Sequence, residues 1–185
     1  SLSAGYAPAA GLRLEAGAWQ SMRLPTFTDL YYTSPAQINN LDLTPERAVT
    51  FRFGASYARS CWNVGLQTYY RLGRDIIDWV WYDDSPESPE AWRGKWHSEQ
   101  SSRLNTFGLE LSGGYSVTEG FLRRVTLSYG YISNDRNADI IAKSAMDFMR
   151  HKAAVAVEVH FLRRMSLALT GSFYDRNGSY TAYPE

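Results

Sequence analysis

Seven aromatic side chains lie in stretches rich in polar and turn-forming residues, where they could contact a ligand. Rigid aromatic rings supply a large contact area at low conformational cost and stack on large, partly apolar ligands. Packing within loops, or a girdle at a membrane surface, accounts for individual members equally well. The candidate ligand-binding residues are Phe27, Tyr31, Tyr32, Trp81, Tyr82, Trp92 and Trp96.

Acidic and histidine side chains give a weaker indication of metal chemistry. Asp83, Asp84, Glu87 and Glu90 offer the oxygen donors that calcium prefers, but without the spacing of a known calcium loop. A solvated acidic loop tip is the favoured interpretation. The three histidines, His97, His151 and His160, are too scattered for a zinc site, so neither a metal nor a cofactor is expected.

One enzymatic alternative uses the same region. Some outer-membrane barrels are hydrolases that combine His with Asp or Ser at the tops of their strands. Here Asp83, Asp84, His97 and Ser98 would have to converge. No motif spacing supports that convergence, and the interpretation favoured here assigns no catalytic residue.

The elements that must position these residues show a repeated period-two pattern, which places every second side chain on one face of a strand. Helical spacing would mix Lys152 and Glu158 into an apolar face, so strands are predicted. The pattern occurs in six segments: residues 48–57, 64–72, 105–115, 125–131, 152–161 and 165–173.

The connections between these segments alternate between short and long. Short turns are expected near residues 59–63, 118–122 and 162–164, and long loops over 23–46, 83–102, 134–150 and from 175 onward. Following the chain up and down places every long loop at one end. That segregation is typical of a transmembrane barrel, with periplasmic turns and extracellular loops.

A membrane barrel reverses the usual arrangement of polar and apolar faces. The apolar stripe then contacts lipid, and a polar face lines a lumen with Arg52, Gln67, Glu110, Lys152, Glu158 and His160. Aromatics expected in the interfacial girdles are Trp19, Tyr57, Trp62, Tyr115, Phe121, Tyr131, Phe161 and Phe173. Basic pairs expected to reach headgroups or water are Arg123 with Arg124 and Arg163 with Arg164.

Composition excludes several other classes. Nineteen basic and nineteen acidic residues leave no net charge, so nucleic acid is not expected as a partner. A single cysteine, Cys61, excludes an internal disulfide and is expected to fill apolar space. Aromatics form 15% of the chain, which suits a protein with two membrane interfaces.

Two ordered motifs resemble TonB-dependent outer-membrane receptors. The first is Arg23-Leu-Pro-Thr-Phe-Thr-Asp-Leu-Tyr-Tyr32 and the second is Asn40-Leu-Asp-Leu-Thr-Pro-Glu46, followed by an alternating strand. Further matches are Asp75-Ile-Ile-Asp78, Asn105 to Glu110 and Leu127 to Tyr131. The motif residues are Arg23, Pro25, Leu30, Tyr31, Asn40, Leu43, Pro45 and Glu46, and the similarity is greatest to cobalamin and iron-siderophore transporters.

The resemblance implies an all-β, antiparallel, up-and-down transmembrane barrel of about 22 strands, of which about seven are expected here. Residues 1–185 are then the C-terminal portion of the barrel, without the plug domain, the TonB-box or the closing strands. It further implies the bacterial outer membrane as location, lipid and a small nutrient molecule as partners, and a TonB complex that acts through the missing N-terminal region.

A soluble alternative is a lipocalin-type ligand-binding barrel, which shows the same alternation but buries its apolar face inside. The two alternatives differ in whether the apolar face of each strand is directed toward lipid or toward a dry interior.

Overall fold

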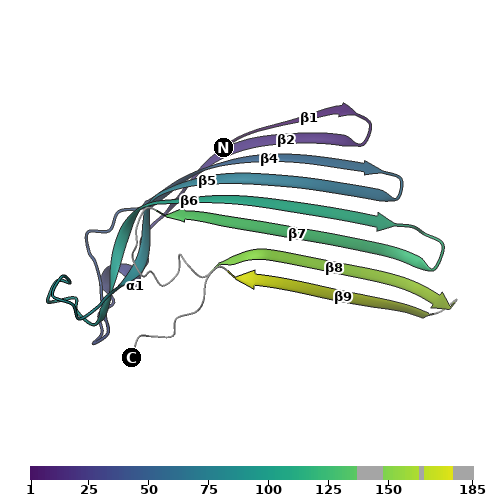
Figure 1. Cartoon of the computed structure of the whole chain (residues 1–185). Helices are drawn as coiled ribbons and strands as arrows, with labels where there is room; N and C mark the ends of the chain where they lie inside the picture. Colours follow the sequence, from purple (N-terminus) through teal and green to yellow (C-terminus); the bar gives the residue numbers. More distant parts are fainter. Residues whose placement is uncertain (137–147, 163–164, 177–185) are drawn as a thin grey trace.

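A single antiparallel sheet dominates the computed structural model, which describes residues 1–136, 148–162 and 165–176. Each long strand pairs with the next along the chain, so the sheet is an up-and-down meander (Figure 1). A short helix, α1 (Phe27–Tyr31), and a two-residue strand, β3 (Gln37–Ile38), lie in one connection. The long strands are β1 (Leu2–Ala9), β2 (Leu12–Arg23), β4 (Glu46–Arg59), β5 (Trp62–Tyr82), β6 (Lys95–Ser116), β7 (Leu122–Arg136), β8 (Met149–Leu162) and β9 (Met165–Arg176).

The all-β, antiparallel, up-and-down architecture expected from the sequence is confirmed. The described residues contain eight long strands, against about seven expected, and β1 and β2 form a hairpin outside the six segments in which the sequence alternates. Their outward positions include alanines such as Ala4, Ala16 and Ala18, whose small side chains weaken the apolar alternation.

The strand register places the polar and apolar positions on opposite faces across the sheet. One row of directly paired residues on the polar face is Glu15, Gly54, Gln67, Glu110, Gly130 and Lys152. The neighbouring row on the apolar face is Leu14, Ala55, Leu66, Leu111, Tyr129 and Ala153. We refer to these as the lumen face and the outer face.

Apolar side chains on the outer face are exposed. Phe53 is 61% exposed, Leu127 55% and Leu169 59%. One girdle expectation needs correction: Trp19 pairs with Thr50 and therefore lies on the lumen face. By contrast, Trp62 and Tyr115 face each other on the outer face with ring centroids 4.6 Å apart.

Connection lengths follow the expected segregation. Short turns join β1 to β2, β4 to β5 and β6 to β7 at one end of the strands. The connection through α1 and that between β5 and β6 lie at the opposite end (Figure 1). Ser60 and Gly120 have left-handed φ values of 49° and 108°, as tight turns require. The expected turn and basic pair at 163–164, and most of the expected loop at 134–150, lie outside the described residues.

Strands β5 and β6 extend well past the others. They contain 21 and 22 residues, whereas about 9–11 tilted residues cross a bilayer. The loop expected over 83–102 is therefore shorter, because β6 already begins at Lys95. The Asp75 to Asp78 motif lies in the upper part of β5.

A compact core forms only beside the long connections. Among the described residues, the buried apolar side chains are Leu43, Ala48, Ile77 and Val80. All four belong to the connection between β2 and β4, the start of β4 or the extension of β5. We call the 24–45 connection together with the extended β5 and β6 ends the cap. None of the described helices is long and apolar enough to cross a bilayer.

Candidate functional site

The cap is fixed to the sheet by two residues of the family motif. Arg23 and Glu46 are paired opposite each other at the ends of β2 and β4, and Arg23 Nη2 lies 2.5 Å from Glu46 Oε1. The same carboxylate oxygen accepts a hydrogen bond of 2.8 Å from the backbone N–H of Ile77. One carboxylate therefore joins β2, β4 and the β5 extension.

The ionisation of Glu46 follows from these contacts. Burial on its own raises the pKa of the carboxyl group, but the hydrogen bonds from Arg23 and Ile77 and the Arg23 charge outweigh it, so the pKa lies below its usual value. The hydrogen bond to Glu46 raises the Arg23 pKa and outweighs burial, which lowers it. Both groups are charged at neutral pH.

Other motif residues shape the loop itself. Thr26 and Asp29 form a reciprocal capping box at the start of α1, and Asp29 is buried. Asn40 donates its backbone N–H to the Asp29 carbonyl at 3.2 Å, and its side chain accepts from the Asp42 N–H at 2.9 Å. The Thr-x-x-Asp spacing is a signal for a helix start that the sequence interpretation did not use.

Gln100 ties the end of this loop to the strands. Its Oε1 accepts from the N–H and hydroxyl of Thr44 at 3.2 and 3.0 Å, while its Nε2 donates to the carbonyls of Thr44 and Asp75 at 2.7 and 2.9 Å. Strand β3 also pairs in parallel with Trp96 and His97 of β6. Sequence reasoning did not identify Gln100, because a lone glutamine in a polar strand carries no motif.

Four of the seven candidate aromatics pack against one another. Trp81 and Trp96 are paired across β5 and β6 with ring centroids 5.4 Å apart. Tyr82 and Trp92 are 5.1 Å apart in an edge arrangement. Trp92 also stacks on His97 at 4.0 Å with an interplanar angle of 15°. These rings stabilise the hairpin that β5 and β6 form, and part of each ring's surface is used in contacts with the other rings.

A polar group completes the hairpin cluster. Tyr82 donates its hydroxyl to Glu99, and His97 Nδ1 lies 3.3 Å from the same carboxylate oxygen. Contact with His97 lowers the Glu99 pKa, and the hydrogen bond from Tyr82 lowers it further. Burial acts in the opposite direction but is outweighed. Burial and the Glu99 hydrogen bond raise the pKa of the Tyr82 phenol. The pair is therefore a neutral donor and an ionised acceptor at neutral pH.

The remaining three candidates are open to solvent in the structure. Phe27 is 77% exposed, Tyr31 57% and Tyr32 47%. Phe27 and Tyr31 lie one turn apart on α1, with ring centroids 4.9 Å apart. The structure thus divides the seven residues into a packed set on the hairpin and an open set on and beside α1.

Neither the hydrolase constellation nor a metal site forms in the described residues. His97 and Ser98 are consecutive in β6 and point to opposite faces, so His97 is not placed to activate the serine. Asp83 instead accepts hydrogen bonds from the hydroxyls of Ser85 and Ser88 at 2.6 and 2.7 Å. No group of three potential ligands is assembled within residues 1–136, 148–162 and 165–176.

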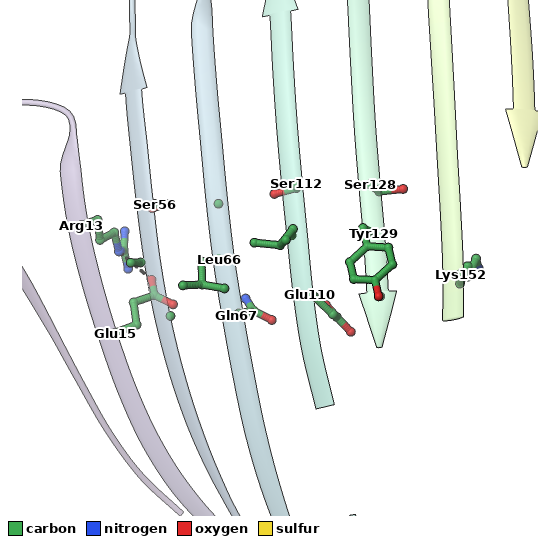
Figure 2. Close-up of a pocket in the computed structure, with 15 residues that line it drawn as sticks. Arg13, Glu15, Ser56, Leu66, Gln67, Glu110, Ser112, Ser128, Tyr129 and Lys152 are labelled. Carbon is green, nitrogen blue, oxygen red and sulfur yellow. Dashed lines mark ion pairs between the residues drawn. The ribbon is translucent and has the colours of Figure 1, made fainter. Parts of the chain in front are cut away.

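The lumen face forms a shallow polar hollow across the central strands (Figure 2). Gln67 and Glu110 are directly paired, and Arg13 contacts Glu15 at 2.6 Å. Small residues such as Ser112 and Ser128 line the same hollow, with Lys152 on β8. The Tyr69 ring extends over Gly108, where a Cβ atom would meet it at 2.1 Å. The lumen face therefore combines polar and small side chains around this hollow.

Comparisons with solved structures agree with this architecture. The siderophore receptor PirA from Pseudomonas aeruginosa matches 94% of this chain with a TM-score of 0.70 at 15% identity, over 30% of its own length. The ferric enterobactin receptor PfeA from Pseudomonas aeruginosa matches 93% with a TM-score of 0.70 at 15% identity, over 27% of its length. The copper transporter OprC matches 86% with a TM-score of 0.66 at 16% identity, over 23% of its length.

The chain thus spans less than a third of the length of these structural relatives, and identities this low show the shared fold alone. No curated protein sequence matches it. A family model described as TonB dependent receptor-like, β-barrel matches residues 1–185. The chain therefore belongs to the TonB-dependent receptor β-barrel family.

Proposed function

We propose that the chain forms part of the wall and of the extracellular cap of an outer-membrane receptor that binds a scarce nutrient and imports it with energy from TonB. Family membership and the separation of turns from cap support this role. The nutrient class is that of iron-siderophore, haem or cobalamin. Receptors for siderophores, one of them in complex with enterobactin, share the fold.

Residues 1–185 supply the barrel portion in this proposal. The plug domain, the contact with the TonB complex and the closing strands belong to parts of the receptor outside these residues. The lumen face, with its small side chains and paired polar groups, then surrounds the route of the nutrient. No catalytic step is assigned to the chain.

The observation that supports this role most directly is that hydrogen bonds fix the cap to the strands while aromatic rings on the cap remain exposed. Arg23, Glu46 and Gln100 hold the loop, while Phe27 and Tyr31 remain exposed. Rings held in place by such a scaffold lose little entropy when a ligand stacks on them. We therefore assign the first ligand contact to Phe27, Tyr31 and Tyr32, with the hairpin tryptophans as support.

The test uses the full-length receptor in a bacterial strain that lacks its own copy. Deletion is expected to abolish uptake of one iron chelate or cobalamin, and the wild-type gene to restore it. The Phe27→Ala, Tyr31→Ala double variant should weaken binding of that nutrient at least about tenfold, as expected for aromatic contact residues. Phe53→Ala, which removes a ring on the outer face whose exposure lies between those of Tyr31 and Phe27, is the control and should bind normally.

Uptake of iron chelates and cobalamin that is undiminished by deletion would contradict the receptor role. Unchanged binding in the double variant, with deletion still abolishing uptake, would contradict only the assignment of the binding rings.

A further inference from the structure

Three arginines lie directly opposite one another on adjacent strands. Arg47 of β4 pairs with Arg74 of β5, and Arg74 pairs with Arg103 of β6. All three belong to the outer-face register and are exposed. Like charges directly opposite each other in a sheet repel and are destabilising. A row of this kind therefore calls for an anionic partner.

The part of the chain that the structure describes supplies no such partner. Among the residues that the structure describes, no ion pair connects Arg47, Arg74 or Arg103 to an acid. The nearest acid on the outer face by register is Asp135, which pairs with Asn105 and is diagonal to Arg103. One diagonal carboxylate, which forms no ion pair with Arg103, leaves the row with a net positive charge.

The height of the row identifies what surrounds it. Ten to twelve residues separate it from Tyr57, Trp62 and Tyr115 near the short turns. At ~3.3 Å per residue and a strand tilt of about 35–45°, that is roughly 25 to 30 Å of height. The apolar band of a membrane barrel is about 25 Å tall, so the row lies just above it.

The outward side chains below the row agree with this depth. Between the three aromatics and the three arginines, the outward positions of β4, β5 and β6 carry no charged side chain. They include Phe51, Phe53, Leu66, Tyr70 and Phe107, all exposed. Charge thus begins abruptly at one level on three neighbouring strands.

We propose that Arg47, Arg74 and Arg103 bind the phosphate groups of lipid headgroups in the leaflet next to the cap. This inference rests on the membrane location in the proposed function. Guanidinium groups present a fork of N–H donors that matches phosphate oxygens, and opposite positions in a sheet are about 5 Å apart, so two arginines reach one phosphate. The row faces away from the lumen, which separates it from the nutrient route.

The experiment measures lipid retention by the full-length receptor in uncharged detergent. The probes are bis-phosphorylated lipid A and the same glycolipid after removal of its phosphates, and native mass spectrometry counts bound molecules. Wild type should retain only the phosphorylated form. Arg47→Gln with Arg74→Gln should weaken retention at least about tenfold, since charge-assisted hydrogen bonds are lost.

The matched control removes two charges from the same strands on the opposite face. Arg52→Gln with Arg71→Gln should retain the phosphorylated lipid as wild type does. A second measurement guards against misfolding: without lipid, the Arg47→Gln, Arg74→Gln variant should unfold at a temperature no lower than wild type, because repulsion has been removed.

Equal retention of the dephosphorylated probe, or undiminished retention by the Arg47→Gln, Arg74→Gln variant, overturns the proposal. If deletion of the receptor leaves nutrient uptake undiminished while the lipid pattern is as expected, the receptor role is overturned and the lipid site is not. Recovery of the receptor outside the membrane fraction of cells overturns both.

Discussion

The Glu46 carboxylate is the point at which three segments of the chain meet. It accepts from Arg23 and from the Ile77 backbone, and its side chain is only 8% exposed. A buried acceptor of two hydrogen bonds is costly to lose, because the donors are left unpaired. The motif pair Arg23 and Glu46 is thereby explained as the attachment of the cap rather than as a ligand site.

Glu46→Gln is expected to loosen the cap without unfolding the sheet. Losing the charge-assisted hydrogen bonds costs about 1.5–3 kcal/mol, so hydrogen exchange at the Ile77 amide should accelerate roughly ten- to a hundredfold. Glu15→Gln, which breaks an exposed pair with Arg13, is the control. An unchanged exchange rate at Ile77 would show that Glu46 does not hold β5.

The same contact sets an acid dependence. Because the Glu46 pKa is lower in the folded chain than in the unfolded chain, its ionised form stabilises the cap above the unfolded value of about 4.3. That contribution is lost as the pH falls through the folded value. The difference in exchange between wild type and Glu46→Gln should therefore shrink steadily below about pH 4.

Gly108 is expected to tolerate no side chain while Tyr69 covers it. A Cβ atom at Gly108 would lie 2.1 Å from the ring, so Gly108→Ala must displace Tyr69 at a cost of about 1–3 kcal/mol. Gly130→Ala on the adjacent strand, with open space around it, is the control. Urea unfolding of the full-length protein in detergent measures both. Adding Tyr69→Ala should remove most of the Gly108→Ala penalty, and a persistent penalty would contradict this explanation.

At the level of elements, the sequence predicted strands wherever large apolar residues alternate with polar ones. It did not predict β1 and β2, where alanine and glycine dilute the signal, nor the β6 extension from Lys95. That extension carries Lys95, Glu99 and Gln100, which look like loop residues. Pairing with β5 and cover from the cap, both non-local, make it a strand.

The candidate site was predictable only in part, for the same reason. Residue type identified Phe27, Tyr31 and the hairpin tryptophans as aromatic surfaces. It did not show which rings stack on each other, because Trp81 and Trp96 are fifteen positions apart in sequence and their pairing depends on the register of β5 against β6. Trp19 was misplaced because its own strand was not recognised.

Gln100 is expected to control the position of the cap loop as a unit. Gln100→Leu removes four hydrogen bonds to Thr44 and Asp75 that hold the loop end on β5 and β6. At about 1 kcal/mol each, even partial loss should make the loop open far more often. Limited proteolysis of the full-length receptor should then cut faster within residues 33–44. Gln67→Leu in the lumen is the control, and equal cleavage rates in the two variants would exclude this role.

At the scale of the whole molecule, the described sheet has almost no interior of its own. Its buried apolar residues lie in the cap or, for Ala48, beside it at the start of β4, while the outer face exposes rings and aliphatic groups along every long strand. A soluble lipocalin-type barrel would turn that face inward, around a dry core. The polar face here carries Arg52, Gln67, Glu110 and Lys152, which a dry core would not accommodate.

Two adjacent substitutions on β8 distinguish these arrangements. Val155 is on the outer face midway along the strand, and Ala154 faces the lumen. If lipid contacts the outer face, Val155→Arg should cost about 2–4 kcal/mol when the full-length protein folds into bilayers, and Ala154→Arg close to nothing. In a soluble barrel with an apolar interior, Val155→Arg would also strongly destabilise the fold. The penalty is therefore measured both in bilayers and in solution without detergent. A Val155→Arg penalty that persists in a soluble, lipid-free state would reverse the assignment of faces, because only then does a protein core, and not hydrocarbon, exclude the charge.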